Sequence, residues 1–496
     1  MYQIDFHKPL HIHFIGIGGI SMSGLAEILL GEDFVISGSD SKSSPLTQAL
    51  EKKGATIYYG QRATNITDDV DVVVYTAAIH PDNPEFACAK EKGLPMLTRA
   101  ELLGQIMRNY DTPVAISGTH GKTTTTSMVS HILLAGDCDP TISVGGILPA
   151  IGGNIRVGNS ETFVTEACEY TNSFLSFFPK ISIILNMDAD HLDFFKDIDD
   201  IRHSFRRFAE LLPADGTLII NADTPKYEDI IRDLPCNVIT YGLEHDADYQ
   251  AADITYDKYG HASFSVLRNG VKVGSYYLKV PGIHNVSNAL AAIALGHLLG
   301  LSEEVIIKGL GSFTGTDRRF QYKGEVAGVT IVDDYAHHPT EIEATLHAAH
   351  NYPHKKLWCV FQPHTYSRTI AFLDDFAKAL SLCDHVIVTD IYAAREKDTG
   401  IVKLRPVRHI TQQAFIDATH RKRTYPLSQV FPVHLHFYGY AHRFRLCVIL
   451  QCLVIPDDIG INSIFRPRLV QHKFRHGTGK ERGLGNLYPH SAVSSP

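Results

Sequence analysis

Short apolar runs alternate along the chain with segments whose apolar residues recur every three or four positions. The first apolar run, His11–Ile15, leads through glycines into Ile20–Leu30, where the apolar spacing is helical. Phe34–Asp40 and Val70–Ile79 are again strand-like, and Arg99–Met107 has helical spacing. Strands that alternate with helices predict a parallel sheet covered by helices.

The alternation continues toward the C-terminus. Further strands are predicted at 112–117, 161–166, 180–186, 328–334, 356–361 and 385–394. A chain of 496 residues is too long for one hydrophobic core. We therefore predict an α/β protein with domains at residues 1–108, 109–320 and 321–402, the last with three strands in one sheet, followed by a tail at 403–496.

Composition limits the classes of protein that fit. The chain is 44% hydrophobic, and its eight cysteines form no Cys-x-x-Cys pair, so neither a disulfide framework nor a cysteine-based zinc site is indicated. The N-terminus lacks a signal-like apolar run, and no apolar stretch is long enough to span a bilayer. A formal charge of −8 argues against general nucleic-acid binding. We expect a cytoplasmic protein without membrane or nucleic-acid partners.

A phosphate-binding loop is predicted between the strand at 112–117 and the next helix. Gly118 and Gly121 allow the backbone N–H groups to turn inward, Lys122 can reach the outer phosphates, and the Thr123 hydroxyl can bind Mg²⁺. The first glycine comes later than in the strict P-loop pattern, and the alternative is an ordinary helix start. The pattern favours ATP binding.

Polar residues follow two of the buried strands, at the sheet edge where open α/β sheets bind ligands. Glu166 ends one strand and is a candidate Mg²⁺ ligand beside Thr123. His191 follows the next strand and could serve a second metal or an acyl-phosphate. The alternatives are a solvated glutamate and a structural histidine.

The glycine turn after His11–Ile15 predicts a second site, for a diphosphate. Gly16, Gly18 and Gly19 would admit the diphosphate, and Asp40 would reach a ribose or base. Ser21 replaces the third glycine of the dinucleotide fingerprint, so a ligand other than NAD is plausible. Alternatively, the glycines only pack the helix against the strand.

Several motifs follow one another along the chain. They are Gly-Ile-Gly-Gly-Ile-Ser at 16–21, Gly-Thr-His-Gly-Lys-Thr-Thr at 118–124, Glu-Ala-Cys-Glu at 166–169, Asp-His-Leu-Asp at 190–193, Gly-Ile-His-Asn-Val-Ser-Asn-Ala at 282–289, Arg-Arg-Phe at 318–320, Asp-Asp-Tyr-Ala-His-His-Pro at 333–339 and Phe-Gln-Pro-His-Thr-Tyr-Ser-Arg-Thr at 361–369. These motifs resemble those of the Mur ligases, the ATP-dependent amide-bond synthetases of peptidoglycan precursor assembly. The resemblance implies a Rossmann-like UDP-sugar domain, a P-loop-type ATP domain and an incomplete Rossmann-like amino-acid domain.

The resemblance also implies residue roles. The implied ATP contacts are Gly118, Thr119, His120, Gly121, Lys122, Thr123, Thr124, Asn288, Arg318, Arg319 and Asp334. The implied metal ligands are Thr123, Glu166 and His191, with Glu169, Asp190 and Asp193 as supporting groups. The implied UDP-sugar contacts are Gly16, Gly18, Gly19, Ser21 and Asp40. The implied surroundings of the amino acid and the acyl-phosphate are Tyr335, His337, His338, His364 and Arg368. The implied catalytic residues are Lys122, His191, His338 and Arg368.

The member implied is one that joins L-alanine to UDP-N-acetylmuramate with ATP and Mg²⁺, through an acyl-phosphate. Tyr335 favours it over the murein-peptide ligases, in which phenylalanine is more frequent. Arg206 and Arg207 lie where several relatives carry a carbamoylated lysine, so that modification is not predicted. Thr365 stands where some relatives have arginine, which leaves one carboxylate contact open. The alternatives are a peptide-adding ligase and a nucleotide-binding protein that makes no amide bond.

The tail departs from this pattern after Val402. Residues 403–496 contain 14 Lys and Arg but four Asp and Glu, in a chain that is acidic overall. They show no sustained period of 2 or 3.6 residues. We hypothesise a frameshift-like replacement, which would leave the third sheet half covered, with a basic nucleic-acid-binding arm as the alternative for the tail. A nucleotide-binding protein that this tail has inactivated is the corresponding alternative to an active ligase.

Overall fold

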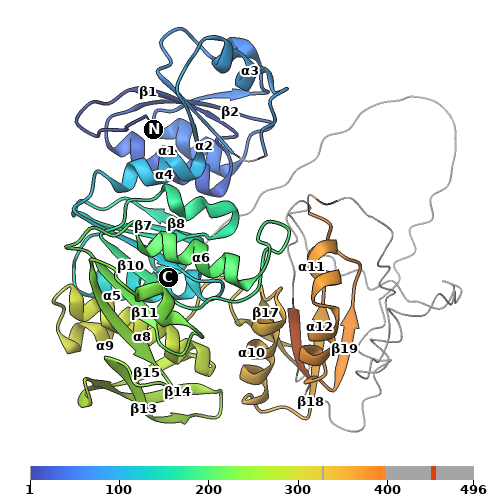
Figure 1. The fold of residues 1–496 in the computed structure, drawn as a ribbon. Coiled ribbons are helices and arrows are strands. Elements are labelled where there is room, and N and C mark those ends of the chain that lie inside the picture. The colour runs from blue at the N-terminus through green and yellow to red at the C-terminus, as the bar shows by residue number, and fades with distance from the viewer. Residues whose placement is uncertain (1, 77, 327–328, 395, 397–447, 454–496) are drawn as a thin grey trace, which may run out of the picture. The chain divides into compact units, whose positions relative to one another are not determined.

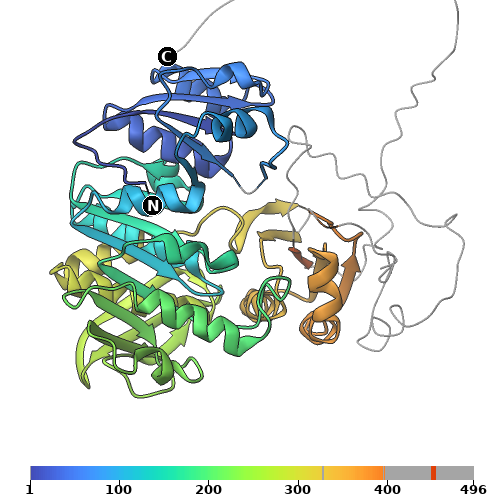
Figure 2. The same cartoon turned by 45° about the horizontal axis from the view of Figure 1, so that its top comes forward.

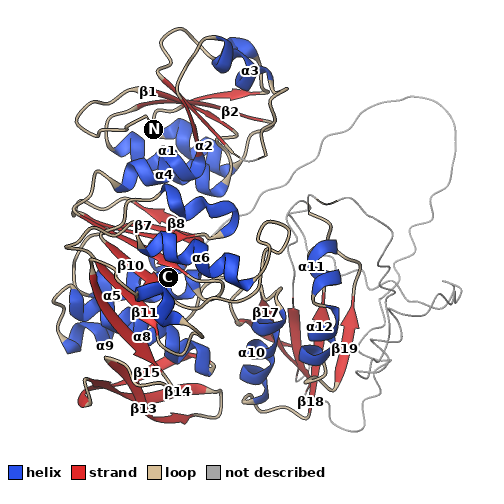
Figure 3. Ribbon diagram, viewed as in Figure 1, coloured by secondary structure: helices blue, strands red, loops and turns tan. Residues whose placement is uncertain are grey.

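The structure, a computed structural model, describes residues 2–76, 78–326, 329–394, 396 and 448–453. All of these lie in one compact unit that spans Met1–Val454. They form three sheets with helices packed on them (Figures 1 and 3). Among these residues, every helix is too short or too polar to cross a membrane.

The first sheet contains five parallel strands in the order β3-β2-β1-β4-β5. Its elements are β1 (His11–Ile15), α1 (Ile20–Gly31), β2 (Val35–Asp40), α2 (Pro45–Lys52), β3 (Thr56–Tyr59), η1 (Ala63–Asn65), β4 (Val72–Tyr75), α3 (Pro84–Glu91), β5 (Met96–Thr98) and α4 (Arg99–Met107). Consecutive valines in β4 are all buried, as a strand covered on both faces requires. The strand order reverses beside β1, and ligand crevices in such sheets open at that point.

The second sheet has ten strands in the order β15-β14-β13-β12-β11-β10-β6-β9-β7-β8. Its elements are β6 (Thr112–Ser117), α5 (Lys122–Ala135), β7 (Thr141–Leu148), η2 (Pro149–Ile151), β8 (Gly153–Arg156), β9 (Thr162–Ala167), η3 (Tyr170–Ser176), β10 (Ile181–Ile184), α6 (Ile198–Ala209), β11 (Thr217–Asn221), α7 (Tyr227–Ile231), β12 (Asn237–Gly242), β13 (Tyr249–Tyr256), β14 (His261–Arg268), β15 (Val271–Pro281), α8 (Ile283–Leu298) and α9 (Glu303–Ser312). The central β6 lies between β10 and β9, parallel to both, so the polar ends of these three strands meet at one edge.

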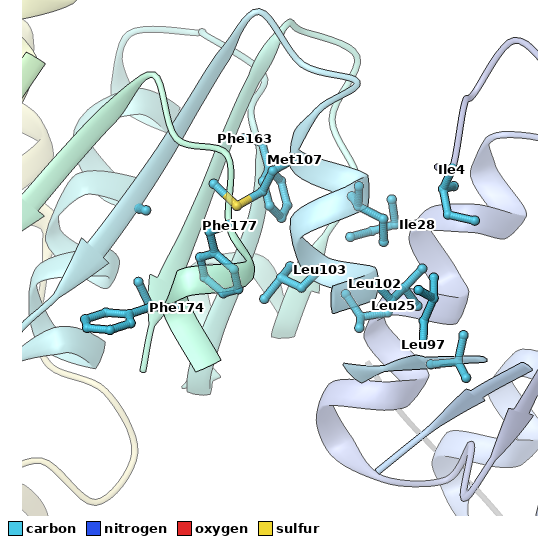
Figure 4. Close-up of a cluster of buried hydrophobic side chains, with 14 of the residues drawn as sticks. Ile4, Leu25, Ile28, Leu97, Leu102, Leu103, Met107, Phe163, Phe174 and Phe177 are labelled. Atoms are coloured by element: carbon cyan, nitrogen blue, oxygen red, sulfur yellow. The ribbon is translucent and has the colours of Figure 1, made fainter. Parts of the chain in front are cut away.

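One hydrophobic cluster continues from the first sheet region into the second through α4 (Figure 4). Leu102 and Leu103 of α4 belong to the same buried cluster as Leu25 of α1 and Phe174 of η3. A Cβ atom at Gly104 would come within 1.9 Å of a backbone carbonyl oxygen in η3, so only glycine permits this approach. The two sheet regions are therefore joined by close packing as well as by the chain.

The third sheet has the order β16-β17-β20-β18-β19. Figure 2 shows this part of the chain in yellow, orange and red. Its elements are β16 (Gln321–Val326), β17 (Val329–Asp334), α10 (Pro339–His350), β18 (Lys356–Phe361), α11 (Tyr366–Ala371), α12 (Leu373–Leu380), β19 (His385–Val388) and β20 (Val448–Leu453). Side chains of α10 and α12 form a buried cluster with those of β17, β18 and β19.

The tail supplies β20, which the sequence pattern did not predict. It pairs antiparallel with β17 on one side and with β18 on the other. Three strands were predicted, and β17, β18 and β19 match them, while β16 and β20 are additional. The facing edges of β17 and β18 have unpaired backbone groups unless a strand lies between them, which explains why an extended six-residue segment can bind there. The other predictions for the tail lie outside the described residues.

Candidate active site

The predicted phosphate loop links β6 to α5 and needs both of its glycines. Gly118 has φ 146° and Gly121 has φ 85°, in the region that favours glycine. A Cβ at Gly118 would lie 2.8 Å from the Cβ of Leu185, and one at Gly121 would lie 2.6 Å from Oδ1 of Asn288. The first turn of α5 has no side-chain cap, so its N–H groups are available to an anion.

Lys122 points back into this loop. Its Nζ donates to the carbonyl oxygen of Gly118 at 2.5 Å, to that of Thr119 at 3.2 Å and to Glu169 Oε2 at 2.8 Å. Burial lowers the pKa of Lys122, but the charge and hydrogen bond of Glu169, together with other nearby groups such as Glu166, outweigh it, and the net shift is upward. The ammonium is therefore charged and held at the centre of the loop.

The predicted metal ligands lie around this ammonium. The Thr123 hydroxyl donates to Glu166 Oε2 at 3.1 Å, and burial raises the pKa of Glu166. His191 Nε2 lies 3.8 Å from Glu169 Oε1, a buried oxygen with no hydrogen-bond partner among the described residues. A half-buried carboxylate, Glu166, and a buried one, Glu169, which has an unpaired oxygen, lie beside a hydroxyl and an imidazole and fit a divalent cation.

A third group of side chains connects the loop to α10. His120 Nε2 lies 3.1 Å from Asp188 Oδ2, and its Nδ1 lies 3.2 Å from Glu341 Oε1. His338 caps α10 and places its Nε2 3.0 Å from the carbonyl oxygen of Ala189. Burial lowers the pKa of His120, but its two carboxylate partners raise it to about 9 overall. This histidine is therefore an imidazolium that joins the second sheet region to the third.

The predicted amino-acid residues form a neighbouring cluster. Arg368 in α11 holds the Asp190 carboxylate with its Nε at 3.1 Å and its Nη2 at 2.9 Å from Oδ1. His337 Nδ1 lies 2.8 Å from the carbonyl oxygen of Tyr335, and its ring centroid is 5.9 Å from that of His364. Burial lowers the pKa of His337 to about 4.

The remaining predicted nucleotide contacts surround these groups. Asn288 Nδ2 donates to Asn285 Oδ1 at 3.2 Å, next to Gly121. The Arg319 guanidinium lies over the ring of Tyr335 at 5.5 Å, and the carbonyl oxygen of Arg318 accepts from Tyr335 N–H.

The carboxylate of Asp334 is hydrogen-bonded to other groups of the protein. Its Oδ2 accepts hydrogen bonds from Phe320 N and from Thr345 Oγ1, and its Oδ1 accepts from Ala336 N. Burial raises the pKa of Asp334 to about 6. The resemblance implied that Asp334 contacts the ATP ribose, which remains a prediction. The observed hydrogen bonds show that Asp334 holds the neighbouring backbone and Thr345 in place.

The second predicted site lies at the first sheet. Gly16 has φ 86°, and Gly18 N–H donates to Asp40 Oδ2 at 2.9 Å. Gly19 precedes α1 without a side-chain cap. Asp40 thus holds the glycine turn, and the uncapped N–H groups of α1 face the position predicted for a diphosphate.

Arg99, which the sequence analysis did not single out, contacts this turn. Its Nη1 donates to Ser21 Oγ at 3.2 Å, and it forms no ion pair with a carboxylate of the described residues. Burial lowers its pKa, so the guanidinium is partly desolvated. Its place directly after β5, at the carboxyl edge of the sheet, could have indicated it.

Asp188, Thr340 and Glu341 were also missed. Asp188 lies inside the run at 186–193 from which other residues were chosen, and Glu341 lies in the first turn of the helix that follows Pro339. The contacts of Asp188 and Glu341 with His120, and of Thr340 with Asp188, join residues far apart in the sequence, so no local spacing indicates them.

Three family models match most of the chain. They are described as Mur ligase family, catalytic domain, at residues 11–111; Mur ligase middle domain, at 116–296; and Mur ligase, glutamate ligase domain, at 318–422. A UDP-N-acetylmuramate–L-alanine ligase of Agathobacter rectalis is 65% identical over 418 residues, which cover 84% of this chain and 91% of the relative. The chain belongs to the Mur ligase family. The predicted family and the predicted α/β fold are thereby confirmed.

Solved Mur ligase structures agree with the fold. A UDP-N-acetylmuramate-alanine ligase of Thermotoga maritima has a TM-score of 0.65 and 32% identity, and the match covers 77% of this chain and 86% of the other. A murein peptide ligase of Psychrobacter arcticus has a TM-score of 0.62 and 27% identity, and the match covers 76% and 84%. The resemblance was expected to stop at Val402. The Mur ligase family models continue beyond it to residue 422 and leave residues 423–496 unmatched.

Proposed function

We propose that this Mur ligase joins L-alanine to UDP-N-acetylmuramate with conversion of ATP to ADP and phosphate, in peptidoglycan precursor synthesis. The observation that supports this proposal most is the contact between the second and third sheet regions. His120 of the phosphate loop contacts Glu341, and Asp190, after β10, pairs with Arg368. This arrangement brings a phosphate-binding lysine close to the predicted amino-acid residues. The need for ATP locates the proposed reaction in the cytoplasm.

The first step converts a poor acyl donor into a reactive one. A carboxylate cannot expel oxide, so an oxygen of the UDP-N-acetylmuramate carboxylate attacks the γ-phosphorus of ATP, and ADP leaves. Lys122, held by Glu169 and two carbonyl oxygens, would turn to the phosphate oxygens as negative charge shifts during transfer. The uncapped N–H groups of α5 would bind the same oxygens.

A Mg²⁺ ion bound by Thr123, Glu166 and His191 would add positive charge beside the phosphates. The unpaired oxygen of Glu169 supports this assignment, because a buried carboxylate oxygen without a partner is costly unless a cation or donor reaches it. The short contact between Thr123 and Glu166 already brings two of the ligands together.

The second step forms the amide bond. The amine of L-alanine attacks the acyl carbon, loses a proton, and phosphate leaves. The candidate bases are the neighbouring histidines His337 and His338, because burial lowers the pKa of each and keeps both neutral near pH 7. His337 is favoured over His338, since both ring nitrogens of His338 already contact the protein, at the carbonyl oxygen of Ala189 and the N–H of Thr340. Arg368 in the third sheet region holds Asp190 in the second. Positioning of the reactants would therefore contribute together with proton transfer.

UDP-N-acetylmuramate is proposed to bind at the first sheet. Its diphosphate would lie on the glycine turn at 16–19, and the cationic Arg99 beside Ser21 would offset part of its charge. No carboxylate of the described residues pairs with this guanidinium, which leaves it available to an anionic ligand.

Phosphate release in mixtures that lack one substrate at a time tests the proposal. Release should require ATP, UDP-N-acetylmuramate and L-alanine together, with the amide product found by mass spectrometry. A preference for a tripeptide over L-alanine would instead support a murein-peptide ligase. Tight binding of the UDP-sugar without phosphate release would support a nucleotide-binding protein inactivated by its tail.

A further inference from the structure

Two imidazoles and a carboxylate converge where the phosphate loop meets α10. His120 Nε2, Asp188 Oδ2 and His338 Nδ1 all lie within 4.8 Å of one another. His120 Nε2 is 3.1 Å from Asp188 Oδ2, and His338 Nδ1 is 3.7 Å from the same oxygen. The three residues come from the loop before α5, the segment after β10 and the N-cap of α10, so the tertiary fold assembles the cluster.

The far side of each imidazole is already oriented by an acceptor. His120 Nδ1 lies 3.2 Å from Glu341 Oε1, and His338 Nε2 lies 3.0 Å from the carbonyl oxygen of Ala189. Histidines that bind metals usually donate their second N–H to a carboxylate or a backbone carbonyl, which fixes the ring and the tautomer. Both histidines show this arrangement, with Nε2 of His120 and Nδ1 of His338 facing Asp188. Nδ1 of His338 also accepts a long hydrogen bond from the N–H of Thr340 at 3.4 Å, which a bound ion would replace.

The spacing fits a small borderline metal ion. Zn²⁺ binds imidazole nitrogen and carboxylate oxygen at about 2.0–2.2 Å, so the ligand atoms of a tetrahedral site lie about 3.3 Å apart. The two distances to Asp188 Oδ2, 3.1 and 3.7 Å, lie on either side of that value. The Asp188 side chain is 34% exposed, which gives an ion a route of entry and a place for water.

We propose that His120, Asp188 and His338 bind a Zn²⁺-class ion, with water as the fourth ligand, and that the ion displaces the proton of His120 Nε2 to solvent. The ion ties the phosphate loop to the first turn of α10. The site is distinct from the one proposed for Mg²⁺ at Thr123, Glu166 and His191, where oxygen ligands predominate and suit a harder cation. Thr340 Oγ1 donates to Asp188 Oδ2 at 2.7 Å and holds the carboxylate in place.

Cobalt binding to the full-length protein tests the assignment. Co²⁺ is added to metal-free protein without nucleotide and with excess Mg²⁺, and the visible absorption typical of tetrahedral Co²⁺ is recorded. The expected result is one equivalent bound by the wild type and by H191Q. H120Q and D188N should bind at least tenfold more weakly, and E341Q should also weaken binding. Circular dichroism of each variant checks that it is folded.

X-ray absorption of the wild-type protein with one equivalent of Zn²⁺ gives a test that needs no variant. Two imidazole ligands and a first shell of nitrogen and oxygen at about 2.0 Å are expected. One imidazole, loss of the cobalt band in H191Q, or an unchanged band in both H120Q and D188N would overturn the proposal. Since these measurements need neither ATP nor substrates, their outcome is independent of the proposed ligase activity.

Discussion

Arg368 and Asp190 form a nearly buried ion pair that connects the third sheet region to the second. The Nη2 atom of Arg368 lies 2.9 Å from Oδ1 and 3.2 Å from Oδ2 of Asp190, and the two side chains are 10% and 7% exposed. Burial raises the pKa of Asp190, but the charges of Arg368 and of the neighbouring histidines together outweigh it and hold that pKa well below its usual value. The pair therefore stays ionised at neutral pH.

Removing one member of this pair should destabilise the protein. We expect Arg368→Ala or Asp190→Ala to lower the free energy of unfolding by about 3–5 kcal/mol, because each leaves a buried charge without its partner. The double variant should cost less than the sum of the two single changes. Urea unfolding of the four proteins measures this coupling, and strictly additive losses would show that the pair does not interact.

Lys122 should be required for phosphoryl transfer. Lys122→Met should reduce phosphate release on the order of 10²–10³-fold, because the ammonium lies in the loop that we propose binds the transferring phosphate. UDP-N-acetylmuramate binding should persist, since the proposed contacts for that ligand lie at the first sheet. Lys53→Met is a matched control, because Lys53 is 50% exposed and pairs with Glu27. Equal phosphate release by both variants would refute the assignment.

His120 should make stability depend on pH in the alkaline range. The pKa of His120 is about 9 in the folded protein, whereas the reference value for histidine is 6.5. Between pH 6.5 and 9 the folded state therefore binds one proton more than the unfolded state. The contribution to stability is complete below pH 6.5 and is lost as the pH rises through 9. It amounts to about 3 kcal/mol. The groups that face His120 are Asp188, Glu341 and the ring of His338.

His120→Gln tests this pH dependence. The unfolding midpoint of the wild type in EDTA should fall between pH 6.5 and 9.5, while that of the variant should change much less. The carboxylates of Asp188 and Glu341 titrate in acid, where their lowered pKa values place them, and so do not contribute in this window. Parallel curves for the two proteins would mean that His120 is not the titrating group.

Arg99 should contribute to UDP-sugar affinity. Arg99→Ala removes a partly desolvated cation beside the glycine turn, and a lost charge-assisted hydrogen bond is worth about 1.5–3 kcal/mol. We therefore expect binding of UDP-N-acetylmuramate to weaken roughly 10- to 150-fold, with ATP binding unchanged. Calorimetry measures both affinities, and Arg99→Lys, which keeps the charge, should lose less. An unaltered affinity in Arg99→Ala would place the diphosphate elsewhere.

The local parts of the site could be predicted from the sequence. Gly118, Gly121 and Lys122 lie within five residues between a strand and a helix, so short-range spacing determines their geometry. Glu166 and His191 could be found because parallel strands end at a common edge. The resemblance to a family supplied the roles that spacing alone left open, and it identified the alanine-adding member.

The contacts between regions could not be predicted in this way. His120 and Glu341 are 221 residues apart, and their meeting depends on how α10 packs against the second sheet region. Arg99 was passed over because one arginine at the start of a helix has no distinguishing local pattern. Whether Asp334 also reaches a nucleotide stays a prediction, because its observed hydrogen bonds are all within the chain.

The tail strand β20 should stabilise the third sheet. Its residue Gln451 pairs with Ile331 of β17 and with Trp358 of β18. In a strand paired antiparallel on both sides every backbone N–H faces a neighbouring strand, so Gln451→Pro removes one ladder hydrogen bond and introduces a ring that a central strand does not tolerate. We expect a loss of about 1–3 kcal/mol.

Thermal unfolding of Gln451→Pro, of Gln451→Ala and of a chain cut after Val402 measures this contribution. The proline variant and the shortened chain should both melt below the wild type, and the alanine variant close to it. If the shortened chain melts with the wild type and keeps its phosphate release, β20 adds nothing to the sheet. The tail would then be an addition that the enzyme tolerates.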